Sequence, residues 1–179
     1  MVNRMLQKKE LLALDGKAPQ AETIQNIADA LRQRGWLLAT AESCTGGLIA
    51  AACTDLAGSS DWFERGFVTY SNAAKTELLG VPPALIEQHG AVSEPVARAM
   101  VAGAVAHSAA HVSVAVTGIA GPTGGSEDKP VGTVWFGWCV GGQCSTERQL
   151  FAGDRASVRT QSAQHALAGL LARVRAVAD

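Results

Sequence analysis

The sequence has few aromatic side chains, little net charge and no long apolar run. Aromatic residues make up 5% of the 179 residues, and the formal net charge is -1. A chain so close to neutral offers no general electrostatic attraction to nucleic acid or to an anionic membrane surface. Its apolar runs all fall short of the roughly 18 to 20 residues that a membrane-spanning helix requires. We therefore expect neither a nucleic-acid partner nor membrane insertion.

The sequence also lacks a secretory signal and a cysteine framework. The N-terminal stretch MVNRMLQKKELLALDGK has no long apolar segment, which favours a cytoplasmic location. The four cysteines (Cys44, Cys53, Cys139 and Cys144) form no CxxC pair and lie in apolar surroundings. In a reducing compartment this pattern favours free buried thiols over a disulfide or metal framework. The histidines show no zinc-ligand spacing with these cysteines, so we expect no metal.

What the sequence does contain is an alternation of helix and strand patterns. Helical patterns cover 21–36, 46–56, 72–80, 81–90, 93–109 and the segment from 153 onward, and strand patterns cover 36–41, 62–71, 111–118, 131–140 and 144–152. The last two strands are separated by GGQ, which predicts a hairpin and therefore an antiparallel pair. We predict an α/β fold, a layered α/β/α domain around a mixed sheet of about five strands, with a C-terminal β-hairpin and final helix. This single domain should span 19–179, after a leader helix at 1–18.

Several helix ends are also predicted by single residues. Gly35 and Gly80 stand where a left-handed residue ends a helix. Ser93 and Asp154 stand at N-cap positions, and Pro95 follows Ser93 in the first turn.

Two of the predicted strands run into segments of unusual composition. The strand at 36–41 is followed by ESCTGG, and the strand at 111–118 leads into GIAGPTGGSEDKP. In α/β sheets, ligands bind at the carboxyl ends of the strands. We therefore expect both segments at one site.

Ser43 and Cys44 are the candidate nucleophiles in ESCTGG. The amides of Thr45, Gly46 and Gly47 should be free at the helix start, where they can stabilise negative charge on a carbonyl oxygen. A simple helix cap by Ser43 or Thr45 explains the same residues, and the local pattern alone favours it. Cys44 would gain nucleophilicity from a helix N-terminus, yet the sequence places no histidine with it.

A base for such a serine is available in GFVTYSNAAKTELLG. Tyr70 is the one tyrosine of the chain, and Lys75 follows at the start of a helix. A lysine in an apolar cleft can lose its charge and accept the serine proton, directly or through a phenol. The spacing alone is better explained by a stacked tyrosine and a solvated lysine.

Thr117 and Arg155 are candidate ligand-binding residues. Thr117 opens the glycine-rich loop, whose amides suit a phosphate or another polar ligand, although the loop matches neither the dinucleotide motif nor the P-loop. Arg155 lies in the first turn of the last helix, where the helix dipole disfavours a cation. Its partner is expected to be Asp154, Asp128 or a ligand phosphate.

These motifs appear together, in the same order, in a known family. ATAESCTGG, VTYSNAAK, GAVSEPVARAM, AVTGIAGPTGG, KPVGTVWFG and FAGDR closely resemble the C-terminal domain of the CinA (competence/damage-inducible) proteins, from about residue 21 to the end. Stand-alone members of that family act as nicotinamide-nucleotide amidases. The resemblance implies deamidation of nicotinamide mononucleotide to nicotinate mononucleotide and ammonia, in pyridine-nucleotide salvage, by a homodimer that needs no metal or organic cofactor.

The resemblance also implies roles for particular residues. Ser43 matches the catalytic serine, and Tyr70 and Lys75 match the tyrosine and lysine of VTYSNxAK. The expected substrate-binding residues are Thr45, Gly46, Gly58, Ser60, Thr117, Gly118 and Arg155. Ser43 would attack the carboxamide carbon while helix N-terminal amides hold the oxyanion, and Lys75 and Tyr70 would move the proton to the departing ammonia. Water would then hydrolyse the acyl-enzyme, with Arg155 and Thr117 on the phosphate and ribose.

Two alternatives to this function remain open. The chain could be an amidohydrolase of the same architecture that acts on another amide, or a nucleotide-binding regulatory module without turnover. A DNA-related role suggested by the family name has no support in a net charge of -1. The chain departs from the family in lacking the larger N-terminal domain of full-length CinA and in carrying a leader of roughly 20 residues.

Overall fold

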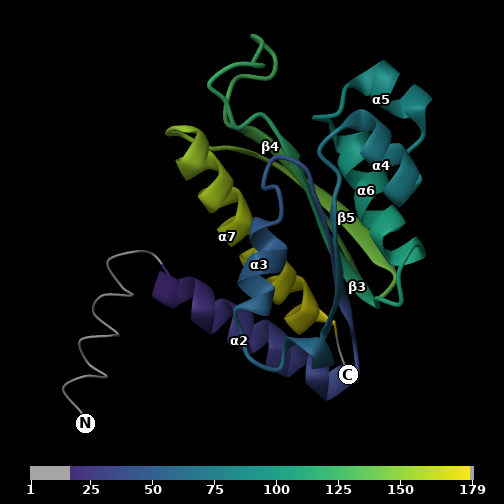
Figure 1. The fold of residues 1–179 in the computed structure, drawn as a ribbon, viewed down its shortest axis with the longest axis vertical. Coiled ribbons are helices and arrows are strands. Elements are labelled where there is room, and N and C mark those ends of the chain that lie inside the picture. The colour runs from purple at the N-terminus through teal and green to yellow at the C-terminus, as the bar shows by residue number, and fades with distance from the viewer. Residues whose placement is uncertain (1–16, 178–179) are drawn as a thin grey trace, which may run out of the picture.

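The computed structural model describes residues 17–177, and Figure 1 shows a central sheet with helices on both faces. The strands are β1 (Leu38–Glu42), β2 (Phe63–Val68), β3 (Val112–Gly118), β4 (Thr133–Val140) and β5 (Gln143–Leu150). The helices within this range are α2 (Lys17–Arg34), α3 (Leu48–Thr54), α4 (Asn72–Leu79), α5 (Pro83–His89), α6 (Glu94–Ala106), α7 (Arg155–Ala176) and the short 3-10 helix η1 (Ser59–Asp61). The predicted α/β fold is confirmed. The predicted leader helix at 1–18 lies almost entirely outside the described residues.

The sheet is mixed, as the predicted hairpin requires. Its strand order is β2-β1-β3-β4-β5. Strand β1 pairs in parallel with both β2 and β3, whereas β3–β4 and β4–β5 are antiparallel. The carboxyl ends of β1, β2 and β3 therefore meet at one edge of the sheet, and the segments that follow them lie side by side there.

The helices pack into two hydrophobic cores, one on each face of the sheet. Helices α2, α3 and α7 pack on one face, against Val112, Val114 and Val116 of β3, while α4, α5 and α6 cover the other face. The second face is lined by small residues, and a Cβ added at Gly137 would lie 2.8 Å from the carbonyl oxygen of Ala97 in α6. Small side chains thus allow α6 to approach the sheet closely, as its alanine-rich sequence predicts. None of the described helices is long and apolar enough to cross a membrane.

Most of the predicted helix ends are confirmed. Gly35 and Gly80 have positive φ angles of 61° and 66° at the ends of α2 and α4. Asp154 caps α7 by accepting a hydrogen bond from the Ser157 amide at 2.8 Å. Ser93 precedes α6 as predicted but makes no side-chain cap, because its hydroxyl instead donates to the carbonyl oxygen of Gly90 at 2.8 Å.

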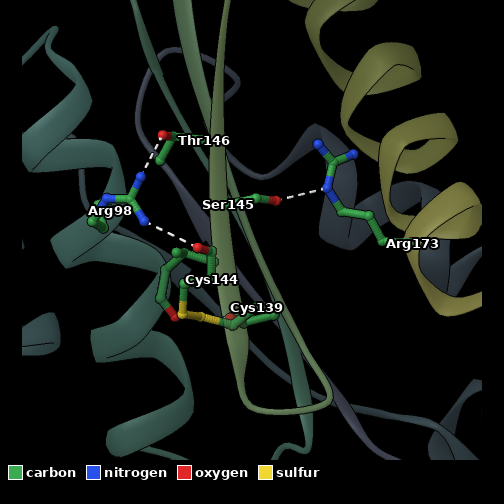
Figure 2. Close-up of a disulfide and its surroundings, with 8 residues drawn as sticks. Arg98, Cys139, Cys144, Ser145, Thr146 and Arg173 are labelled. Atoms are coloured by element: carbon green, nitrogen blue, oxygen red, sulfur yellow. Dashed lines mark hydrogen bonds between the residues drawn. A yellow bond between two sulfur atoms is a disulfide. The ribbon is translucent and has the colours of Figure 1, made fainter. Parts of the chain in front are cut away.

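The prediction that all four cysteines are free is wrong for one pair. Cys139 and Cys144 form a disulfide across the β4–β5 hairpin (Figure 2). The hairpin register places these two residues directly opposite each other, with 4.1 Å between their Cα atoms. Cys44 and Cys53 are free and buried, as predicted.

Candidate active site

A cavity of about 240 Å³ opens where β1, β2 and β3 end. Its lining comes from every segment that reaches this edge of the sheet. The lining residues are Ser43, Cys44, Tyr70, Asn72, Lys75, Ala91, Val92, Thr117, Gly118, Ala120 and Arg155. The two unusual segments that follow β1 and β3 therefore do meet at one site, together with the start of α4 and the start of α7.

Ser43 and Lys75 are in direct contact inside this cavity. The Lys75 Nζ lies 3.0 Å from the Ser43 Oγ and 2.8 Å from the carbonyl oxygen of Thr69. Ser43 follows β1, and its own amide donates to the carbonyl oxygen of Val116 in β3, which fixes it to the sheet edge. Lys75 reaches the serine from α4, whose first turn is capped by the Ser71 hydroxyl. The pair is the arrangement that a lysine base needs to take a proton from a serine.

The surroundings of Lys75 favour the neutral amine. Lys75 is 1% exposed, and this burial lowers the pKa of its amine. No carboxylate within 17–177 lies within ion-pair distance of its Nζ. A buried lysine without an anionic partner is more readily deprotonated than an exposed one, which favours a role as a base.

Burial has the opposite effect on the reactivity of the neighbouring thiol, that of Cys44, because it favours the unreactive protonated form. Cys44 lines the same cavity, but burial raises the pKa of its thiol to about 11, an effect only partly offset by nearby backbone amides and by Lys75. A thiol with a raised pKa is protonated near neutral pH and is a poor nucleophile. The geometry therefore favours Ser43 over Cys44.

Glu42, which the sequence analysis did not single out, organises the start of α3. Its fully buried carboxylate accepts hydrogen bonds from the amides of Gly47, Ile49 and Ala50, at 3.0, 3.0 and 2.8 Å. The carboxylate thus satisfies amides that the first turn of a helix leaves without intrahelical partners. The sequence feature that could have identified Glu42 is its position as the one charged residue at the end of an otherwise uncharged strand.

The amides expected to hold an oxyanion are consequently different from those predicted. Gly47 donates to Glu42, and the amide of Gly46 donates to the carbonyl oxygen of Ser43 at 3.1 Å, so neither is free. The amides of Cys44 and Thr45 donate to no oxygen of the described chain, and both lower the pKa of the Cys44 thiol. Cys44 lines the cavity, whereas Thr45 is fully buried, so the Cys44 amide is the donor available to a ligand next to Ser43.

Tyr70 and Arg155 meet at the opening of the cavity. The Arg155 Nη2 lies 3.3 Å from the Tyr70 hydroxyl, and its Nη1 donates to the carbonyl oxygen of Gly121 at 2.9 Å. The Tyr70 side chain is 62% exposed. Neither Asp154 nor Asp128 forms an ion pair with Arg155 in the described chain, so its two observed contacts are those with Tyr70 and Gly121.

The remaining predicted binding residues divide into two groups. Thr117 and Gly118 line the cavity, although the Thr117 hydroxyl donates to the carbonyl oxygen of Ala91 at 2.8 Å. Gly46 lies outside the lining, and Thr45 is fully buried behind it. The structure does not bring Gly58 and Ser60 to the cavity. They belong to the segment that precedes β2, at the opposite end of that strand, where the Gly58 carbonyl oxygen binds Arg32 of α2.

We expect Glu42→Gln to destabilise the protein by about 2–4 kcal/mol, because the uncharged amide would leave at least one buried backbone donor without an acceptor. Urea unfolding measures the free energy. Glu77→Gln on the exposed surface of α4 is the matched control and should change it little. An unchanged unfolding free energy for Glu42→Gln would contradict the anchoring role.

The fold and the cavity together define a class of protein: an α/β/α domain that holds a hydrogen-bonded serine and lysine at the carboxyl ends of its parallel strands. The family model described as the CinA C-terminal domain matches residues 20–174. The chain belongs to this family.

Three relatives are similar to this chain over most of their own length. A protein named nicotinamide-nucleotide amidohydrolase PncC from Enterobacter agglomerans is 58% identical over 142 residues, which is 79% of this chain and 87% of that protein. The protein of the same name from Escherichia coli K12 is 54% identical over 144 residues, 80% of this chain and 87% of that protein. The crystal structure of competence damage-inducible protein A from Klebsiella pneumoniae has a TM-score of 0.85 at 41% identity, covering 89% of this chain and 99% of that one.

Proposed function

We propose that this protein is an amidohydrolase that converts nicotinamide mononucleotide to nicotinate mononucleotide and ammonia, in pyridine-nucleotide salvage. The observation that carries the proposal is the 3.0 Å contact between the Lys75 Nζ and the Ser43 Oγ in an open cavity. The names of two relatives at 58% and 54% identity support the choice of substrate.

The proposed reaction begins with attack of the Ser43 Oγ on the carboxamide carbon. The neutral amine of Lys75 takes the hydroxyl proton as the new C–O bond forms. The carboxamide oxygen becomes an oxyanion, which we expect the amide of Cys44 to stabilise. Lys75 then returns the proton to the amide nitrogen, the C–N bond breaks, and ammonia leaves an ester of nicotinate on Ser43.

The second half repeats the first with water as the nucleophile. Lys75 takes a proton from water, the hydroxide attacks the ester carbon, and the proton passes to the Ser43 Oγ as that bond breaks. Tyr70 is expected to assist proton transfer to ammonia, since its hydroxyl accepts from Arg155 and keeps its own proton free to donate. In total, one amide and one water give one carboxylic acid and one ammonia.

Arg155 and Thr117 are proposed to hold the phosphate and ribose. Arg155 is the better supported of the two, because its guanidinium stands exposed at the cavity with no carboxylate partner in the described chain. Binding roles for Gly58 and Ser60, the homodimer and the cytoplasmic location stay predictions.

The test is ammonia release by the purified protein from nicotinamide mononucleotide, measured beside nicotinamide, nicotinamide riboside and unrelated amides. We expect turnover of the mononucleotide well above that of the same amide without its phosphate, since loss of the Arg155 contact removes a charge-assisted bond. Faster turnover of another amide would identify a different amidohydrolase. Tight mononucleotide binding with no ammonia at any pH from about 6 to 10 would instead indicate a binding module.

A further inference from the structure

Helix α7 contributes a second arginine to the site, one turn beyond Arg155. Arg159 donates from its Nε to the carbonyl oxygen of Cys44 at 3.1 Å and from its Nη2 to the carbonyl oxygen of Thr45 at 2.9 Å. These two carbonyls belong to the two residues that directly follow Ser43. Arg155 therefore reaches the cavity, while Arg159, four residues later on the same side of the helix, holds the turn that carries the nucleophile.

The guanidinium of Arg159 makes its hydrogen bonds to this turn and is not neutralised by a carboxylate of the described chain. The side chain is half-buried, and no carboxylate of the described residues lies within ion-pair distance of it. Arg173, a half-buried arginine further along α7, differs in having Glu147 at 3.8 Å and a hydrogen bond to Ser145 (Figure 2). A cation without an anionic partner keeps a net positive field next to the point where negative charge develops.

Because the peptide bond is planar, the contacts of Arg159 with carbonyl oxygens also set the direction of neighbouring amides. In a trans peptide the C=O and N–H point in opposite directions, so a fixed carbonyl also fixes the N–H of the same unit. One unit in the turn shows the effect. Arg159 holds the Thr45 carbonyl, and the N–H of the same peptide, that of Gly46, points to the Ser43 carbonyl oxygen at 3.1 Å.

The next contact carries this control to the amide beside the nucleophile. The Ser43 carbonyl that accepts from Gly46 shares its peptide unit with the N–H of Cys44, so this N–H points away from Gly46. The Cys44 N–H has no oxygen acceptor in the described chain, and Cys44 lines the cavity. Arg159 also holds the Cys44 carbonyl, so the turn is fixed on both sides of this residue.

We propose that Arg159 is a positioning residue of the amidase reaction, which fixes the turn after Ser43 so that the Cys44 amide stabilises the oxyanion formed on Ser43. The inference rests on the proposed amidase function. It assigns Arg159 an effect on the chemical step and none on substrate binding.

Steady-state kinetics on nicotinamide mononucleotide test the proposal. Arg159→Met should lower kcat about tenfold or more, less than the roughly 100-fold or greater loss that follows deletion of an oxyanion donor, while KM changes little. Arg159→Lys keeps the charge but not the two-point contact and should give an intermediate kcat. Arg173→Met is the matched control on the same helix and should retain wild-type kcat. Circular dichroism confirms that each variant is folded.

A thioamide substrate supplies a readout that a purely structural role would not change. Sulfur accepts hydrogen bonds weakly, so the thiocarboxamide analogue of the mononucleotide gains less than the amide from an oriented donor. The preference of the wild type for amide over thioamide, as a ratio of kcat/KM values, should shrink in Arg159→Met and partly recover in Arg159→Lys.

The outcomes separate this inference from the proposed function. A wild type without amidase activity, or an active Ser43→Ala variant, overturns the proposed function itself. With those two results as expected, a wild-type kcat, a change in KM alone or an unchanged thioamide ratio in Arg159→Met overturns the positioning role. Where Arg159→Met does not fold, the same criteria apply to Arg159→Lys.

Discussion

Ser43→Ala is expected to lower the rate of ammonia release from nicotinamide mononucleotide by about 10⁴-fold or more, since removal of a catalytic serine has effects of this order. The hydroxyl is the atom that Lys75 contacts at 3.0 Å, and alanine leaves that base without a nucleophile to activate. Ser43 is 8% exposed and its amide remains bonded to β3, so the small change should leave the fold intact. Ammonia release and separation of the nucleotide product both measure the loss.

Cys44→Ala is the matched control one residue further on. The thiol is buried, and its pKa is raised to about 11, so it is protonated at neutral pH. The substitution keeps the Cys44 backbone amide that we place near the oxyanion. Most of the activity should therefore remain. Loss of activity in Cys44→Ala together with an active Ser43→Ala would reverse the assignment of the nucleophile.

The fold could be predicted from the sequence because its signals are local. The apolar spacing of Ile24, Ile27 and Leu31 predicts the buried side of α2, and all three are buried in the structure. The double glycine at 141 and 142 predicts the hairpin, and it forms the turn between β4 and β5. Local patterns of this kind fix the type and order of the elements, and the short connections then leave few ways to arrange them.

The disulfide and the positions of Gly58 and Ser60 depend on features that such local patterns do not determine. Cys139 and Cys144 pair because the hairpin register sets them opposite each other, and a shift of one residue would separate them. Gly58 and Ser60 precede β2, so the direction of that strand carries them away from the cavity.

The site itself was only partly visible in the sequence. Ser43 and Lys75 could be selected by residue type and by family motif. Their direct contact depends on the tertiary structure, because the two residues are 32 positions apart in the sequence. Glu42 and Arg159 were missed because each binds the backbone of the nucleophile turn, and main-chain amides and carbonyls carry no residue-specific signal. Arg159 is also 115 residues from Cys44 along the chain, beyond any local pattern.

These contacts explain how the short turn after β1 holds Ser43 in a fixed position. Glu42 holds the start of α3 from the sheet side, and Arg159 holds the carbonyls of Cys44 and Thr45 from α7. Glu42 occupies the amides of Gly47, Ile49 and Ala50, whereas the Cys44 amide beside Ser43 has no oxygen acceptor in the described chain. Preorganised donors of this kind stabilise a transition state without reorganisation at the moment of reaction.

Lys75→Met should reduce kcat by about 10²- to 10⁴-fold, the range typical of a lost general base. The Met side chain fills a similar volume but cannot accept the Ser43 proton. Lys129→Met is the matched control, because Lys129 also donates to a backbone carbonyl, that of His89, but does not line the cavity. Wild-type turnover in Lys75→Met would rule out Lys75 as the base.

The pH dependence and the stability of the same variant complete this prediction. The base must be neutral, so kcat/KM of the wild type should rise with pH, and burial lowers the pKa of Lys75, which places this rise at lower pH than for an ordinary lysine. A lowered folded-state pKa also means that the charged lysine costs stability, most fully below that pKa, and that this cost disappears as pH rises toward the unfolded-state value. Lys75→Met should therefore unfold at an equal or higher temperature than the wild type near neutral pH, with a gain that shrinks at alkaline pH. A variant that is inactive yet at least as stable would show that the lysine is buried for its chemistry, since a residue kept only for packing would lower the unfolding temperature when replaced.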